Sequence, residues 1–354
     1  MEHTMSEQQR VSEALNRALH TIAATKADVI FLGEDILDPY GGAFKVSRGL
    51  STQFPGSVFT TPISEQALIG VAAGLALSGN KPIVEIMFGD FIALAFDQIL
   101  NFATKSVSMY GSALPLNLLV RCPVGAGRGY GPTHSQSLQK HFVGIPNLAL
   151  YELSPFHDIS KLLHHLLELG HPSILFEDKV LYTQRVYRDG VIDDIFSYKF
   201  IESANDFAQV YIDNPSPGPS VIISPGGLVS RSLNAARILL IEDGLDNHII
   251  VPSRLYPFDI EPLLELLADA PSILIVEEGT SGGTWGSDVA QRIYERLWGV
   301  LKRPLQLISS RDSIIPSAPH LEKNIVIQHG DIIQRFRQAH TNALPPHNDV
   351  SRRY

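Results

Sequence analysis

The chain has 354 residues, of which 44% are hydrophobic and 18% charged, a length and balance typical of a two-domain globular protein. A single cysteine, Cys122, excludes an internal disulfide framework and a cysteine-rich metal site, and it fits a reducing cytoplasm. The formal net charge of -9 and the isoelectric point near 5.8 give no electrostatic signature of nucleic-acid or anionic-membrane binding, so we expect neither partner.

The first half of the chain alternates strand-like apolar runs with helical patterns. An amphipathic helix is predicted over 6–25, with Ser6 in a capping position. A second helix, apolar on nearly every side, is predicted over 64–78, with Ser64 as its cap. Further strands are expected at 28–35, 81–88, 115–123, 148–153 and 173–179, and further helices at 90–110 and 157–170. Buried strands joined by helical crossovers form parallel sheets, so we predict a doubly wound α/β domain over 1–200.

The second half of the chain repeats this organisation after a polar interruption. The stretch that ends in DNPSPGPS predicts a linker at 201–218. Strands are then expected at 220–224, 248–251, 272–278 and 305–309, and helices at 228–243, 260–269, 286–298 and 330–340. This second series predicts another doubly wound domain over 219–340, followed by a flexible tail at 341–354.

The chain shows no sequence signal for membrane insertion or export. The apolar run 67–77 is well short of the roughly 20 residues that span a bilayer. The N-terminal segment carries Glu2, Glu7 and Glu13 and lacks an apolar signal core. We therefore expect a cytoplasmic protein without a membrane partner.

One carboxylate, Glu65, stands at the start of the apolar helix in TTPISEQALIGVAAGLAL. The macrodipole stabilises an acid in the first helical turn by about 0.3–1 kcal/mol, which is the simplest explanation for its presence. A helix without a polar face, however, implies that this acid is partly buried and needs a partner. Glu65 therefore either starts a helix or serves a buried site.

Three further features follow predicted strands. The loop GAGRGYG resembles a dinucleotide fingerprint, but Tyr130 occupies a position that requires glycine, and no P-loop is present. His134 lies in the same loop, where α/β sheets place ligands, although a single loop histidine often has no special role. Phe88 and Phe91 flank a strand-to-helix junction, for which core packing is the simplest expectation.

Five stretches in order resemble one family: FLGEDI…YGGAFKVSRGL, TTPISEQALIGVAAGLAL, PIVEIMFGDFIALAFDQILNFATK, THSQS and ILIVEEG…GTWGSDVA. From about residue 8 to 338 the chain resembles the beta subunit of the thiamine-diphosphate-dependent decarboxylating component of 2-oxoacid dehydrogenases, pyruvate or branched-chain type. The resemblance implies a transketolase-like pyrimidine-binding domain followed by a transketolase C-terminal domain. It also implies oxidative decarboxylation of a 2-oxoacid and transfer of the acyl group to the lipoyl domain of a dihydrolipoyl acyltransferase.

The resemblance assigns roles to individual residues. Glu65 matches the acid that hydrogen-bonds a ring nitrogen of the cofactor's aminopyrimidine and supports its activation, and Phe91 matches the aromatic residue that packs on that ring. His134 matches the active-site histidine, which serves the substrate and the acyl transfer. Glu34 fits a second acid near the cofactor, whereas Phe88 is expected to stay in the core.

The metal-binding motif of this cofactor class is missing, because the chain contains no GDG sequence. The resemblance therefore implies that an alpha subunit holds Mg²⁺ and the diphosphate within an α2β2 heterotetramer, and we expect no metal ligand in this chain. Two alternatives remain. One is a split thiamine-diphosphate-dependent decarboxylase or carboligase of a specialised pathway, to which the unusual segments NPSPGPS and PVGAGRGYGPTHSQSLQKHF point. The other is a non-catalytic scaffold subunit.

Overall fold

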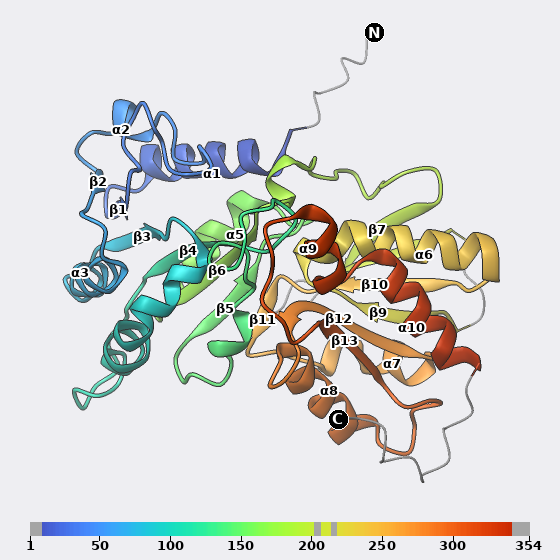
Figure 1. Cartoon of the computed structure of the whole chain (residues 1–354). Coiled ribbons are helices and arrows are strands. Elements are labelled where there is room, and N and C mark those ends of the chain that lie inside the picture. The colour runs from blue at the N-terminus through green and yellow to red at the C-terminus, as the bar shows by residue number, and fades with distance from the viewer. Residues whose placement is uncertain (1–8, 202–206, 214–217, 342–354) are drawn as a thin grey trace, which may run out of the picture.

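The computed structural model describes residues 9–201, 207–213 and 218–341, which form two α/β domains lying side by side (Figure 1). The sheet of the N-terminal domain has the strand order β11-β5-β6-β4-β3-β1-β2. Its strands are β1 (Val29–Gly33), β2 (Val58–Thr60), β3 (Lys81–Glu85), β4 (Leu119–Val124), β5 (Ala149–Glu152), β6 (Ser173–Asp178) and β11 (Arg254–Tyr256). All pair in parallel except β11, which the C-terminal half contributes antiparallel to β5.

The C-terminal sheet has the order β13-β12-β9-β10-β8-β7. Its strands are β7 (Phe196–Ile201), β8 (Phe207–Ile212), β9 (Ser220–Ile223), β10 (Asn247–Val251), β12 (Ile273–Thr280) and β13 (Gln306–Ser310). Strands β9, β10, β12 and β13 pair in parallel, whereas β8 pairs antiparallel with β10 and β7. The predicted α/β class with two mainly parallel sheets is confirmed.

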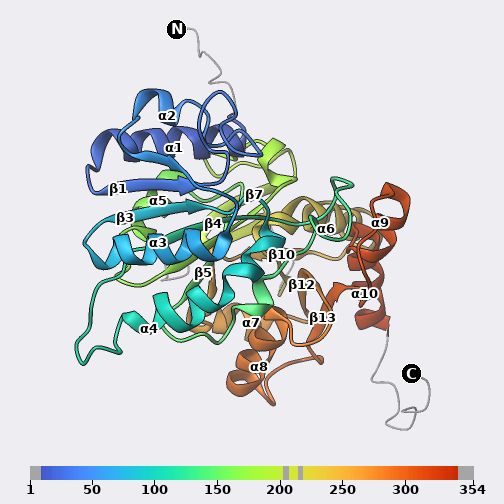
Figure 2. The ribbon, with the colours of Figure 1, turned by 60° about the vertical axis from the view of Figure 1, so that its left-hand side comes forward.

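Helices cover both faces of each sheet. They are α1 (Val11–Thr25), α2 (Leu50–Gln53), α3 (Glu65–Leu77), α4 (Thr104–Ser106), α5 (Ile159–Leu166), α6 (Val229–Asp243), α7 (Leu264–Asp269), α8 (Trp285–Leu297), α9 (Pro319–Ile325) and α10 (His329–Thr341). Figure 2 shows α1 on one face of β1 and β3 and α3 on the other. No helix of the described ranges is long and apolar enough to cross a membrane.

The two domains share one apolar core. A single cluster of buried side chains contains Leu68 of α3 and Val120 of β4, and it continues to Val221 of β9 and Trp285 of α8. Trp285 also donates a hydrogen bond from its indole nitrogen to the carbonyl oxygen of Leu255 in β11 at 2.9 Å. Burial of this continuous surface fixes one domain against the other.

The prediction of a linker at 201–218 is wrong where the structure describes that stretch. Strand β7 ends at Ile201, and β8 lies almost entirely within the range. In β7, Phe196 and Tyr198 are buried while the residues between and after them are more exposed, so the alternation typical of a strand is present but short. Residues 202–206 and 214–217 lie outside the described residues, as does the expected tail from 342 onward.

The helix predicted over 90–110 is also different from a regular α-helix. It consists of a 3₁₀ helix η1 (Gly89–Ala95), a π-helical segment η2 (Gln98–Ala103) and α4. The Asp90 carboxylate in the first turn of η1 accepts hydrogen bonds from the backbone and side chain of Gln136, and this tertiary contact accompanies the tighter winding. Helix α1 begins at Val11 with Arg10 as its N-cap residue, and Ser6, which was predicted to cap it, lies outside the described residues. Ser64 caps α3 as predicted.

Candidate active site

Glu65 is the first residue of α3, directly after the loop that follows β2. Its side chain is buried, with the residue only 4% exposed, as the apolar helix predicted. Within the described residues, no group donates a hydrogen bond to the Glu65 carboxylate, although buried acids normally have such a partner. The acid therefore keeps its capacity to accept a hydrogen bond from a group outside this chain.

Glu34 lies beside Glu65, immediately after β1 ends at Gly33. Its carboxylate accepts a hydrogen bond from the backbone N–H of Ser64 at 2.9 Å, so it helps to fix the start of α3. Burial raises the pKa of Glu34, and the neighbouring Glu65 carboxylate raises it further. The structure thus brings these two predicted site acids together.

His134 lies against the two phenylalanine side chains of the β3–η1 junction. The centroid of its ring is 4.6 Å from that of Phe88 and 5.2 Å from that of Phe91, and both pairs meet edge to face. The Thr133 hydroxyl is 2.9 Å from Nδ1 of the imidazole. The structure therefore joins the predicted site residues Phe91 and His134.

The expectation that Phe88 stays in the core is wrong. Phe88 lies beyond the carboxyl end of β3, where it is half-buried and also contacts Phe44 and Tyr130, at centroid distances of 5.3 and 5.7 Å. Strand β3 ends at Glu85, so Phe88 belongs to the sheet edge and not to the packed layer. Phe44 and Tyr130 were missed, although both stand in glycine-punctuated loops of the kind that line α/β ligand sites.

Both groups of residues lie along one edge of the N-terminal sheet. Glu34 follows β1, Phe88 follows β3 and His134 follows β4, and these three strands are neighbours in the sheet. Helix α3, which carries Glu65, packs against η1, which carries Phe91. This carboxyl edge is where parallel α/β sheets bind ligands.

A buried ionic network lies within the sheet next to this carboxyl edge. Arg121 of β4 is 1% exposed and donates hydrogen bonds to Glu85 of β3 at 2.6 Å and to Glu177 of β6 at 2.8 Å. Ser47 and Tyr182 donate further hydrogen bonds to the same two carboxylates. The network connects strands β3, β4 and β6. Its charged residues were not singled out from the sequence, because they stand within strands that are otherwise largely apolar.

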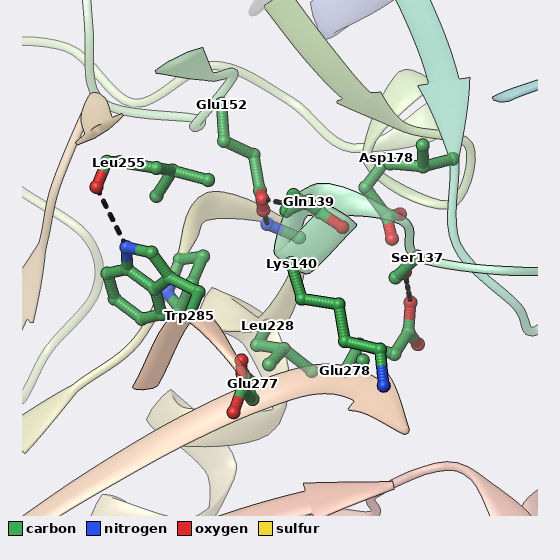
Figure 3. A pocket seen from close by; sticks show the side chains of 14 residues that line it. Ser137, Gln139, Lys140, Glu152, Asp178, Leu228, Leu255, Glu277, Glu278 and Trp285 are labelled. Atoms are coloured by element: carbon green, nitrogen blue, oxygen red, sulfur yellow. Dashed lines mark hydrogen bonds between the residues drawn. The ribbon is translucent and has the colours of Figure 1, made fainter. Parts of the chain in front are cut away.

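A pocket lies between the domains (Figure 3). Four carboxylates line it: Glu152 and Asp178 from the N-terminal sheet, and Glu277 and Glu278 from β12. Burial raises the pKa of Glu152, Asp178 and Glu277 to about 7 in each case. No cluster of histidine, cysteine or acidic residues in the described ranges is arranged to hold a metal ion.

The chain belongs to the transketolase-like class of proteins. Residues 7–184 match the family model of the transketolase pyrimidine binding domain, and residues 213–332 match that of the transketolase C-terminal domain. A split-gene transketolase, solved as an inactive beta4 tetramer, superposes with a TM-score of 0.69 at 19% identity, covering 92% of this chain and 96% of its own. That likeness shows the fold.

Curated relatives narrow the class. The chain is 31% identical to the pyruvate dehydrogenase E1 component subunit beta of Chaetosphaeridium globosum, over 92% of this chain and 96% of the relative. It is 29% identical to the acetoin:2,6-dichlorophenolindophenol oxidoreductase subunit beta of Cupriavidus necator, over 90% and 93% of the two chains. The protein belongs to the family of beta subunits of the 2-oxoacid dehydrogenase E1 component, so the resemblance seen in its sequence is confirmed.

Proposed function

We propose that this beta subunit, together with an alpha subunit, binds thiamine diphosphate at the carboxyl edge of its N-terminal sheet and decarboxylates a 2-oxoacid oxidatively. The observation that carries the proposal is the buried Glu65 carboxylate, which receives no hydrogen bond from the described residues. A protonated ring nitrogen of the aminopyrimidine is a donor that fits this acid. Phe91 supplies an apolar surface from the adjoining helix η1.

The residues of this chain have separable tasks in that reaction. When bound, thiamine diphosphate supplies a carbon nucleophile and an electron-accepting ring. Glu65, a largely buried residue, holds a proton at the pyrimidine nitrogen, and Glu34 fixes the start of the helix that carries Glu65. His134 donates or accepts a proton at the substrate and in the acyl transfer.

The remaining parts of the site come from partners. An alpha subunit holds Mg²⁺ and the diphosphate in an α2β2 heterotetramer, and the lipoyl domain of an acyltransferase receives the acyl group. The missing GDG sequence and the lack of a metal-type cluster in the described residues support the first part. The similarity to beta subunits of pyruvate dehydrogenase E1 components also supports an alpha subunit as the partner. The lone cysteine, which allows no internal disulfide, supports a cytoplasmic location.

A second candidate is cleavage of acetoin or a similar 2-hydroxyketone in a specialised pathway. The observation that favours it is the acetoin oxidoreductase subunit beta among the relatives, which aligns over 90% of this chain. The same edge site would serve both reactions, because each breaks a carbon–carbon bond next to a carbonyl group.

Reconstitution tests these candidates together. The chain is coexpressed with an alpha subunit from the same genome, and reduction of 2,6-dichlorophenolindophenol is followed with pyruvate, branched-chain 2-oxoacids and acetoin. We expect turnover with one substrate class, loss of turnover without thiamine diphosphate, and acyl transfer to a lipoyl domain if the substrate is a 2-oxoacid. Assembly without turnover on any substrate would indicate the scaffold role instead.

A further inference from the structure

The loop that carries His134, residues 125–137, is held by the C-terminal domain. Glu278 of β12 accepts a hydrogen bond from the backbone N–H of Ala126 at 3.3 Å and from the hydroxyl group of Ser137 at 2.9 Å, through the same oxygen atom. Figure 3 shows the Ser137 contact at the edge of the interdomain pocket. One carboxylate of the second domain thus ties both ends of the loop together.

The Glu278 carboxylate is itself held in place. Arg231 of α6 donates from Nη1 to the other oxygen of Glu278 at 2.9 Å. Burial opposes ionisation, but Arg231 outweighs it and lowers the pKa of Glu278, so the carboxylate remains an acceptor. Burial, and then the neighbouring Glu278 carboxylate, raise the pKa of Asp178.

The loop approaches this pair so closely that one of its positions requires glycine. Gly125 has φ +92°, and a Cβ atom there would collide with the carboxylates of Asp178 and Glu278. A second contact lies two residues further along the loop, where the backbone N–H of Gly127 donates a hydrogen bond to Glu322 of α9 at 2.9 Å. The contacts therefore follow the loop backbone and not only its ends.

The same loop is linked to the aromatic residues of the site. The Gln136 side chain donates to the Asp90 carboxylate at 2.8 Å, and Asp90 stands directly before Phe91. His134 belongs to the loop that Glu278 and the Gln136 contact hold, and its ring lies against Phe88 and Phe91. The position of the imidazole thus depends on contacts from both domains.

We propose that Glu278 is a positioning residue, which holds the His134 imidazole against Phe88 and Phe91 from the C-terminal domain. This inference deepens the proposed function and rests on it for the catalytic meaning of His134. The alternative is that Glu278 merely holds the two domains together. The two differ in what happens to the histidine when Glu278 is removed.

Lys140 provides the matched control. Its ammonium group donates to the carbonyl oxygens of Thr280 and Gly282, at 2.9 and 3.1 Å, so it joins the same two domains just outside the loop. Glu278→Ala and Lys140→Met therefore both remove interdomain contacts, but only the first removes the hydrogen bonds that Glu278 accepts from residues 125–137. Ser137→Ala is a milder variant that leaves the Arg231–Glu278 pair intact.

The full-length chain alone is sufficient for the first measurement. For Glu278→Ala we expect amide hydrogen exchange in 125–137 to accelerate about tenfold or more, and the His134 ring signals in NMR spectra to lose the shifts caused by the two phenylalanine rings. For Ser137→Ala we expect a smaller change of the same kind, and for Lys140→Met none in this loop. Unchanged exchange and unchanged His134 signals in the glutamate and serine variants would overturn the proposal.

A second measurement in the reconstituted complex connects positioning with turnover. We expect Glu278→Ala to lower kcat at least about tenfold while the KM for substrate and the affinity for thiamine diphosphate change much less. Equal losses in Lys140→Met would show that Glu278 acts only as an interdomain contact. If the wild-type complex has no activity, the proposed function fails, whereas the exchange and NMR data still decide the role of Glu278.

Discussion

At the scale of single residues, the decisive feature is an acid whose position has two explanations. Glu65 starts α3, where the helix dipole favours it, but it is also buried beside Glu34 and receives no hydrogen bond from the described residues. An acid needed only to start a helix would lie equally well in water. Burial beside a second acid is a cost that a bound donor offsets.

Glu65→Gln separates these explanations. Glutamine is close in size and still accepts a hydrogen bond, but it cannot share a carboxyl proton with the pyrimidine ring. We expect turnover and hydrogen–deuterium exchange at the thiazolium carbon of the cofactor to be lost in the reconstituted complex, with stability changed by about 1 kcal/mol or less. Exchange at the wild-type rate would show that Glu65 only starts a helix.

Glu152 in the interdomain pocket makes stability depend on pH. It accepts hydrogen bonds from the Gly227 N–H and the Gln139 side chain, both at 2.9 Å, yet burial raises its pKa from 4.5 to about 7. Because the folded-state pKa is raised, the stabilisation from the protonated form is fully present below pH 4.5 and is lost as the pH rises through about 7.

The neutral variant Glu152→Gln isolates this effect. We expect the unfolding free energy of the wild type, relative to this variant, to fall by on the order of 3 kcal/mol between pH 5 and 8. Urea denaturation of the two proteins at several pH values measures it. A difference that does not vary with pH would mean that Glu152 is ionised throughout this range.

At the scale of elements, α3 has an outer face that nothing in the described chain covers. Ile63, just before the helix, is 77% exposed, and Val71 is 55% exposed. Gly74 lies nearby in the helix interior, and a Cβ atom there would meet no other atom within 4 Å. The fold of this chain therefore does not require glycine at 74, although glycine weakens a helix. We expect a partner to pack closely against this face.

Gly74→Ala tests whether this face is an interface. We expect the isolated chain to gain up to about 1 kcal/mol of stability from the better helix former, while its affinity for the alpha subunit decreases. Gly330→Ala in α10 is the control. A Cβ atom at this residue also meets no other atom within 4 Å, and Gly330 belongs to the C-terminal domain. Unaltered assembly in the Gly74 variant would place the interface elsewhere.

Elements with long, regular patterns could be predicted from the sequence, whereas those shaped by tertiary contacts could not. The apolar pattern and the Ser64 cap identified α3, and the parallel strands followed from their buried runs. Strand β7 was missed because only Phe196 and Tyr198 alternate within polar surroundings. The helix expected at 90–110 changes its winding where Asp90 binds Gln136, a contact that no local pattern contains.

The residues of the candidate site differ in the same way in how far the sequence points to them. Glu34, Glu65, Phe91 and His134 stand in loops or first turns after strands, where a motif has a local signature. Glu278 has no such signature, because it acts on a loop that lies far away in sequence and in the other domain. Long-range polar contacts of this kind arise only when the whole chain is folded.

At the scale of the whole molecule, the proposed cofactor site is shared between this chain and an alpha subunit. In the proposed function, Glu65 and Phe91 at the edge of the N-terminal sheet hold the pyrimidine ring. The described residues contain no group of histidine, cysteine and acidic side chains arranged to hold a metal ion. The two domains share a continuous core and are firmly joined, so we do not expect a rearrangement within the chain to create a site for the metal ion and the diphosphate. We expect a partner subunit to hold both.

Calorimetric titration of thiamine diphosphate and Mg²⁺ tests this most directly. The cofactor is titrated into the chain alone, into the complex with the alpha subunit, and into the complex with Glu65→Gln. We expect weak or undetectable binding to the isolated chain and tight, Mg²⁺-dependent binding to the wild-type complex. The variant should bind in the complex but remain inactive. Tight, Mg²⁺-dependent binding by the isolated chain would contradict the shared site.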